Sequence, residues 1–320
     1  MVSEFVFSLV LLILGLLLTS SFVKLQHTSP GFNANNLLTF RVIAPEVNYG
    51  KFTWGEKDPC REKLYEKIEQ VLTEVPGVES VALAANLPLA QNLNSSPVLV
   101  TVRAPQPKAT KPNFSEEEST GTQIVNPQYF HTLGVELMSG RFFEERAREA
   151  ASNVAIVNEA FAHKFLPNED AIGREVTVWF AKTIIVGVVA DFKIISLDRN
   201  PVPEIFWCLR QASPPNVRIL TRGKSDLAAL GETLRRKIQD VDPDLPVQEM
   251  EPMQAVIADS LSLKRVSATL IGLVAVLAII WRVPKSTALC RTPFASGARK
   301  WVSASHSERT EVTWWACTSI

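Results

Sequence analysis

The chain has 320 residues, which is enough for two domains of ordinary size. Its 33 Lys and Arg residues balance its 33 Asp and Glu residues, so the formal net charge is zero. This balance gives no reason to expect nucleic acid or a strongly acidic substrate as a partner.

The first apolar segment runs from Phe5 to Val23 without a charged residue. At about 1.5 Å per residue, a helix of this length reaches roughly 28 Å, the hydrocarbon thickness of a bilayer. A cleaved signal peptide is the alternative. However, Glu4 precedes the segment without any Lys or Arg, and no A-x-A-like cleavage site follows. We therefore predict a retained transmembrane helix within residues 1–24.

The second apolar segment, Val266 to Trp281, is barely long enough to span a bilayer, and a buried core helix is the alternative. Its many small residues suit helix packing within a membrane, so we predict a second, short span at residues 263–281. Basic residues after Trp281 place both termini in the cytoplasm by the positive-inside rule. Residues 25–265 are then periplasmic or otherwise extracytoplasmic, and the lipid bilayer is an expected partner.

Two β-α-β units are predicted near the two ends of this extracytoplasmic segment. In each unit a helix with one apolar face lies between two short strands. The first unit comprises residues 37–44, 60–75 and 78–85, and the second comprises residues 216–221, 226–241 and 245–250. Ser225 is the expected cap of the second helix. The repeat predicts an α+β fold, a small split layer with its helices on one side of a sheet.

Residues 87–213 separate the two units and read as an inserted, β-rich subdomain. The insertion opens with a polar, proline-rich stretch that is typical of a surface loop. Helical turns are expected at residues 126–133, and a strand at 154–157 leads into a helix at 158–165. Strands follow at 175–180 and 183–190, of which the second has the β-branched composition of a buried central strand.

No pattern of catalytic or metal-binding residues is found. The sequence lacks phosphate-loop, H-E-x-x-H, C-x-x-C and G-x-S-x-G motifs. Its four histidines are scattered: His27, His131, His163 and His306. The acidic run at residues 116–118 reads as a solvated cluster, and capping or turn chemistry accounts for Asp191 and Asp198. Cys60 and Cys208 are expected to be unpaired thiols. We predict no enzyme, no cofactor, and no catalytic, cofactor-binding or metal site.

Eight local segments follow one another along the chain, among them PGVESVALAANLPL, VNPQYFHTLGVELMSGRFF, VAIVNEAFAHKFLPNEDAIGREV and IVGVVADFK. Taken in this order, the eight segments resemble MacB-like/FtsX-like ABC transporter permeases of the acidobacterial duplicated type. The resemblance covers about residues 5–281. In such permeases a periplasmic core domain, flanked by spans, has a split porter-like part and an inserted β-rich part. The resemblance thus assigns residues 25–86 and 214–262 to the porter-like subdomain.

The resemblance also implies partners and a role. These are an ABC-type ATPase subunit or domain, a second permease half or a homodimer partner, and a periplasmic adaptor. The protein would be a non-catalytic permease subunit of an efflux or mechanotransmission complex in the bacterial inner (plasma) membrane, passing ATP-driven motion across it. The matching segments define the fold rather than ligand sites.

The pattern of the family ends after Ile280, and residues 282–320 form an irregular tail. A shifted reading frame through these codons can spell GAEVYGVMSYAVRLRSAEMGIRIALGA, which is similar to the segment after the second span in such permeases. We therefore expect a frameshift near Trp281, a truncated second span, and loss of the segment that couples to the ATPase. A genuine basic tail is the alternative.

Two other classes of protein are alternatives to a permease subunit. A two-span receptor with an extracytoplasmic ligand-binding domain would require a signalling helix or kinase module after the second span, where only the irregular tail is present. An anchored periplasmic enzyme would require converging polar residues, which the sequence does not show.

Overall fold

The computed structural model describes the region between the two predicted spans, with gaps. It covers residues 28–51, 58–89, 98–102, 119–144, 153–167, 169–178, 181–224 and 226–261, and Val10, Ile13, Leu17, Ser20, Leu270 and Leu273. Most of each predicted span, the acidic run at residues 116–118 and the whole tail therefore lie outside the described residues. Among the described residues, no helix is long and apolar enough to cross a bilayer.

Four antiparallel strands form a sheet that we call the split sheet, in the order β11-β1-β10-β2. Their bounds are Val247–Pro252 for β11, Leu37–Ile43 for β1, Asn216–Gly223 for β10 and Val78–Ala84 for β2. The strands come from both ends of the extracytoplasmic segment, because β1 and β2 precede the insertion and β10 and β11 follow it. This arrangement confirms the predicted pair of β-α-β units.

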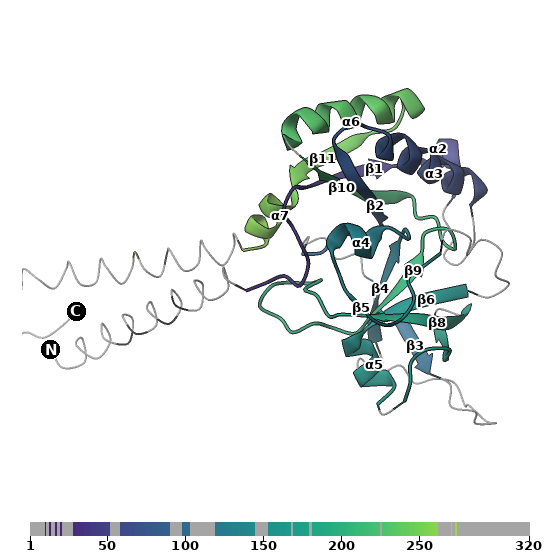
Figure 1. The fold of residues 1–320 in the computed structure, drawn as a ribbon, viewed down its shortest axis with the longest axis vertical. Helices are drawn as coiled ribbons and strands as arrows, with labels where there is room; N and C mark the ends of the chain where they lie inside the picture. The colour runs from purple at the N-terminus through teal and green to yellow at the C-terminus, as the bar shows by residue number, and fades with distance from the viewer. Residues whose placement is uncertain are drawn as a thin grey trace, which may run out of the picture.

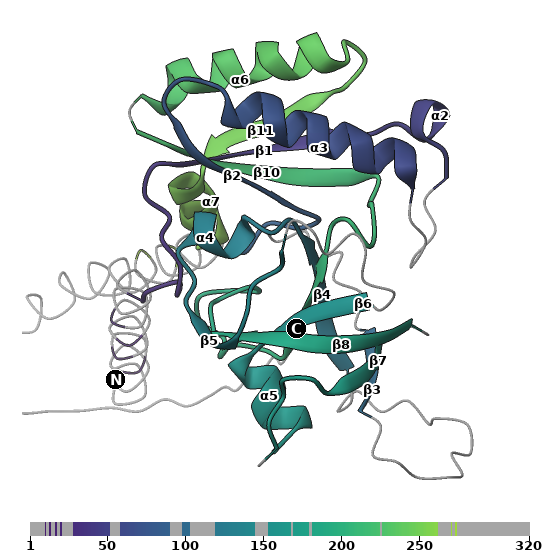
Figure 2. The same ribbon diagram turned by 45° about the vertical axis from the view of Figure 1, so that its right-hand side comes forward.

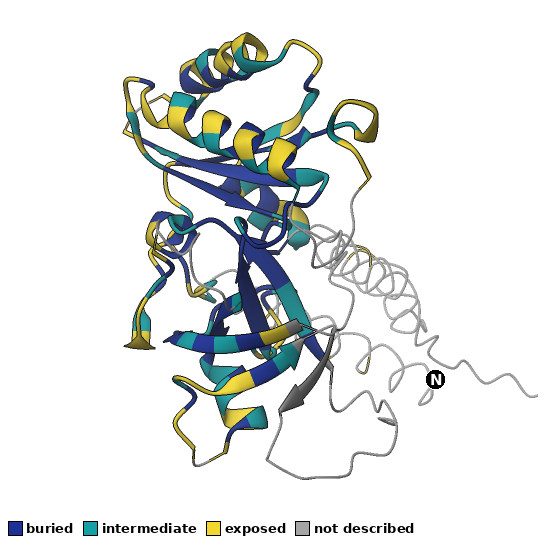
Figure 3. Cartoon of the chain, turned by 90° about the vertical axis from the view of Figure 1, so that its right-hand side faces the viewer, coloured by how far each residue is buried: buried dark blue, intermediate teal, exposed yellow. Residues whose placement is uncertain are grey.

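The two long helices, α3 (Pro59–Thr73) and α6 (Leu227–Val241), lie side by side over one face of the split sheet (Figures 1 and 2). Apolar residues at helical spacing bury this face, with Leu64, Ile68 and Leu72 from α3 beside Leu234 and Ile238 from α6. Figure 3 shows the outward sides of both helices exposed above the buried strands. A short helix, α2 (Glu46–Tyr49), precedes α3.

The prediction that helices cover only one side of the sheet is wrong. The short helices α4 (Tyr129–Leu133) and α7 (Met253–Ser260) pack against the opposite face. Leu37 of β1, Leu220 of β10, and Ala82 and Ala84 of β2 point to that face and join a second core cluster that includes Tyr129 and Phe130 of α4. Residues 126–133 were expected to be helical turns. The apolar periodicity of α3 and α6 predicts helices on one face of the sheet only. It gives no information about the short helix α4, which covers the other face.

Six further strands close into what we call the strand ring, in the order β4-β3-β7-β8-β6-β9, with β9 pairing back to β4 (Figure 2). Their bounds are Ser119–Val125 for β4, Val98–Val102 for β3, Glu175–Val178 for β7, Ala181–Val189 for β8, Asn153–Asn158 for β6 and Glu204–Cys208 for β9. β5 (Leu137–Gly140) pairs with β8, and α5 (Glu159–Phe165) packs on β6. All of these strands come from the predicted insertion.

The prediction of a central strand at residues 183–190 is confirmed, because β8 pairs with β7 and with β6. The expected cap of α6 is wrong. The carboxylate of Asp226, one residue further along, accepts a hydrogen bond from the Ala228 amide and caps the N-terminus of the helix. The last strand of the second unit begins and ends two residues later than expected.

Candidate functional site

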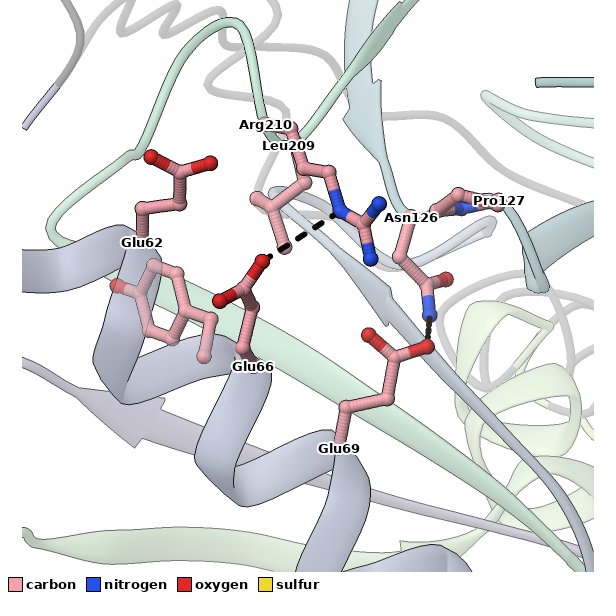
Figure 4. A pocket seen from close by; sticks show the side chains of 8 residues that line it. Glu62, Glu66, Glu69, Asn126, Pro127, Leu209 and Arg210 are labelled. Carbon is pink, nitrogen blue, oxygen red and sulfur yellow. Dashed lines mark hydrogen bonds and ion pairs between the residues drawn. The ribbon is translucent and has the colours of Figure 1, made fainter. Parts of the chain in front are cut away.

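A pocket lies where the split sheet, its helix α3 and the strand ring meet (Figure 4). Its volume is about 270 Å³, counting the part that is open to solvent. The residues that line it come from α3, from the end of β4 and from the turn after β9: Glu62, Tyr65, Glu66, Glu69, Asn126, Pro127, Leu209 and Arg210. The site therefore joins the first β-α-β repeat, through α3, to segments of the insertion.

Asn126 is the central residue of this junction. It follows β4 directly, and its buried side-chain amide forms hydrogen bonds with the backbone of β2. Its Oδ1 accepts from the Leu83 amide at 3.0 Å, while its Nδ2 donates to the Val81 carbonyl at 3.4 Å. The same Nδ2 donates to Glu69 Oε1 of α3 at 2.7 Å. One side chain thereby connects β4, β2 and α3.

The acidic face of α3 supplies the other wall of the pocket. Glu62, Glu66 and Glu69 recur at i, i+4 and i+7, which puts their side chains on one side of the helix. Arg210 approaches Glu66 with Nε 3.7 Å from Oε1. The turn that carries Arg210 is held in place because the Leu209 amide donates to the Val125 carbonyl at 2.7 Å. Charge complementarity thus adds to the hydrogen bonds of Asn126.

Tyr65 fastens α3 to the segment that leads into β10. Its buried hydroxyl donates to the Pro214 carbonyl at 2.5 Å. Burial is the main cause that raises the pKa of this hydroxyl far above its ordinary value, so it remains a donor at every physiological pH. Nearby, the fully buried Arg61 donates to the Gly50 carbonyl and pairs with Asp58 at 3.0 Å.

The hydrogen bonds and the ion pair of this site connect α3, β2, β4 and the turn after β9. No serine, cysteine or histidine is among the residues that line the pocket. Within the described ranges, no group of three or more His, Cys, Asp and Glu residues is arranged to hold a metal ion. Asp191 and Asp198 have the roles expected for them. The former accepts from the Ala160 amide of α5 at 3.0 Å, and the latter accepts from the Ser196 hydroxyl at 2.6 Å.

The cysteine prediction is confirmed, because Cys60 is an exposed free thiol and Cys208 a buried one. Burial raises the pKa of the Cys208 thiol and keeps it protonated and unreactive.

A buried carboxyl group was missed by the sequence analysis. Glu204 begins β9 and is 2% exposed, and burial raises the pKa of its carboxyl to about 8. It faces Gly121 of β4, where an added Cβ would lie 2.5 Å from Oε2. The only signal in the sequence was a charged residue immediately before the apolar run IFW.

Sequence reasoning also missed Asn126 and Arg210, since it nominated no site residues. Asn126 precedes a proline after a strand, a pattern that indicates a turn and does not reveal which strand edge the amide reaches. Arg210 and Glu66 are far apart in sequence and meet only through the fold.

The chain is similar to one described protein family and to solved structures of low sequence identity. The family model described as the MacB-like periplasmic core domain matches residues 6–237. The crystal structure of the periplasmic region of MacB from Actinobacillus actinomycetemcomitans is 13% identical with a TM-score of 0.46, covering 73% of this chain and 95% of that one. The extracellular domain of the noncanonic ABC-type transporter YknZ from Gram-positive bacteria is 15% identical with a TM-score of 0.42, covering 66% and 100%.

A search of curated protein sequences finds no match. The matched range of the family model nevertheless covers well over half of the 320 residues. The chain therefore belongs to the family of MacB-like periplasmic core domains, which are parts of ABC transporter permeases.

Proposed function

We propose that this chain is a non-catalytic permease subunit whose extracytoplasmic domain passes motion between the membrane and partners outside it. The observation that carries the proposal is the position of the two ends of the folded part. The residues after the first predicted span and helix α7 before the second lie side by side (Figure 1), and Gln254 Nε2 donates to Asn35 Oδ1 at 3.2 Å. Both predicted spans would then enter the bilayer from one place.

Exposed apolar residues support the membrane anchor. Among the described residues, the large apolar side chains on the surface are few, and five of them belong to the two predicted spans. These five are 48–60% exposed: Val10, Ile13, Leu17, Leu270 and Leu273. Water does not favour such side chains, whereas lipid tails would cover them.

The domain division and the partners are part of the same proposal. We assign residues 25–86 and 214–262 to the porter-like subdomain and 87–213 to the inserted subdomain. The strand ring, whose strands all come from the insertion, supports this. Partners would be an ABC-type ATPase, a second permease half or second copy, and a periplasmic adaptor. The described domain would lie in the periplasm of a bacterial inner membrane.

We further infer that residues 282–320 are read out of frame. The shifted frame can encode a segment similar to the one that follows the second span in permeases. In that frame the middle base of each codon is the first base of a codon in the given frame. This base is nearly fixed by the given sequence, so a chance match over this length is improbable. Sequencing the gene around the codon for Trp281 is expected to show a gained or lost base. An uninterrupted frame in the native gene would refute this part of the proposal.

The function is tested by comparing the chain as it stands with a form in which the frame is restored. Both are tagged, extracted from membranes in mild detergent and purified, and the captured proteins are analysed for an ABC ATPase by mass spectrometry and ATP hydrolysis. We expect only the restored form to retain the ATPase, because the coupling segment lies beyond Trp281.

Two outcomes would contradict the proposal. If neither form retains an ATPase, the chain is not part of an ABC complex. Equal retention by both forms would show that the segment beyond Trp281 does not couple to the ATPase.

A further inference from the structure

The residues that follow the first predicted span pack against the folded domain and do not form a free linker. We call residues 28–36 the entry segment. On one side it contacts the loop after β8. The Lys193 amide donates to the Pro30 carbonyl at 2.8 Å, and the ring of Phe32 meets that of Phe192 edge-on at 6.3 Å. Phe32 is only 7% exposed. The loop that follows β8 of the strand ring therefore holds the first half of the entry segment.

Gly31 shows how close this contact is. Its φ is +82°, and an added Cβ would lie 2.8 Å from the Cα of Phe192. Both the positive φ and the close backbone approach require glycine at this position. The backbone of the entry segment is consequently in direct contact with the loop that follows β8.

On its other side the entry segment is held by Arg222 of β10. Its Nη1 donates to the Asn35 carbonyl at 2.5 Å, and its Nη2 donates to the Asn33 carbonyl at 2.8 Å and to the Thr132 carbonyl at 2.6 Å. Its Nε also donates to Thr132. A single planar guanidinium thus connects β10, the end of α4 and two residues of the entry segment.

A second contact reinforces the first. The Asn33 amide donates to the Leu133 carbonyl at 2.8 Å, so the entry segment bonds to the end of α4 with its own backbone as well. Hydrogen bonds from a charged guanidinium to a carbonyl are stronger than hydrogen bonds between two neutral groups. Partial burial lowers the pKa of Arg222 somewhat, which indicates that its charge is partly shielded from water.

We propose that Arg222 is a positioning residue that locks the entry segment to β10 and α4, so that a displacement of the first span reaches the split sheet and the strand ring together. This inference rests on the proposed function only in taking the first span as the source of the motion. Without the lock, the entry segment would act as a loose linker and would absorb such a displacement.

Hydrogen–deuterium exchange on the full chain in lipid nanodiscs tests the lock. We expect Arg222→Ala to raise exchange at least 10-fold in peptides covering residues 28–36 and 129–135, and to leave peptides from β6 and β8 unchanged. Arg222→Lys should resemble the alanine variant, because one ammonium cannot replace a planar fork that bridges three carbonyls. Arg236→Ala is the matched control, since Arg236 is exposed on α6 and donates only to its own helix at Glu232.

Spin-label distances test the transmission itself, with Cys60, Cys290 and Cys317 replaced by serine. Labels at Ser29, at Lys182 in the strand ring and at Lys237 on α6 define three pairs. In Arg222→Ala we expect the distribution between Ser29 and Lys237 to broaden, because the bonds to β10 are lost. Both pairs that involve Lys182 should keep their width, because the contacts of Pro30 and Phe32 with the loop after β8 remain.

Three results would overturn the inference. They are exchange that stays unchanged in the alanine variant, exchange that rises uniformly over the whole domain, and Arg222→Lys that matches the wild type. If the alanine variant does not fold, the lysine variant decides alone. None of these measurements involves an ATPase, so failure to capture one would refute the proposed function and leave the lock standing.

Discussion

Buried polar side chains mark the places where distant segments of this chain meet. The buried amide of Asn126 bonds the Leu83 amide and the Val81 carbonyl of β2, whose pairing with β4 is limited to Ala84. The half-buried Arg222 binds three carbonyls from two segments. Burial of such groups is tolerated because their hydrogen bonds are satisfied. Removing one partner costs more than the bond itself contributes, because the other partner is left buried and unpaired.

Asn126→Ala is expected to destabilise the domain by about 2–3 kcal/mol, because the Leu83 amide and the Val81 carbonyl lose their partner. Denaturant unfolding of the detergent-solubilised chain, followed by tryptophan fluorescence, measures this change. Asn48→Ala is the control, since Asn48 is exposed on α2 and should change the free energy of unfolding by less than about 0.5 kcal/mol. Equal effects of the two substitutions would show that the junction does not depend on Asn126.

Glu204 makes the stability of the domain depend on pH. Its pKa is raised from 4.5 to about 8, so between these values the folded state keeps a proton that the unfolded state has released. The free energy of unfolding should therefore fall as the pH rises from about 5 to 8. Glu204→Gln removes this dependence and should stabilise the domain at pH 8 by on the order of 2 kcal/mol.

Unfolding curves at pH 5 and pH 8 measure this difference. Glu169→Gln, at an exposed position where Glu169 pairs with Arg174, serves as the control. If the wild type and Glu204→Gln lose stability equally between the two pH values, Glu204 is not the group responsible.

Helices and strands with strong hydrophobic periodicity were predictable from the sequence. The elements with which they pair or pack were not. α3 and α6 each bury one apolar stripe, so their existence and approximate bounds follow from local spacing. The strand ring depends on β9 returning to pair with β4 across nearly 80 intervening residues, and no local pattern specifies such a pairing. The short helix α4 was too brief for its covering role to be apparent.

The caps of helices show the same limit at a finer scale. Ser225 and Asp226 are both good N-cap residues, and only the backbone geometry decides between them. Asp226→Ala should destabilise the domain by about 1 kcal/mol, because the Ala228 amide loses its acceptor. Asp240→Ala, an exposed substitution near the other end of α6, is the matched control and should have a much smaller effect. The same unfolding measurement compares them, and a neutral Asp226→Ala would exclude this cap.

At the scale of the whole molecule, the two ends of the described domain meet beside α4 and α7, and the split sheet and the strand ring both contact this region. A protein that passes motion from two membrane spans into an outer domain needs such a common entrance. Whether the domain lies outside the membrane is the condition on which the rest of the functional account depends.

Cysteine labelling tests this condition directly, because the chain carries its own reporters. Cys60 is exposed and Cys208 is buried in the described domain, while Cys290 and Cys317 belong to the tail that we expect in the cytoplasm. A membrane-impermeant maleimide added to intact spheroplasts should label the wild type, and Cys60→Ser should abolish this labelling until the cells are lysed. If Cys60 reacts only after lysis, the domain lies on the cytoplasmic side and the account is wrong.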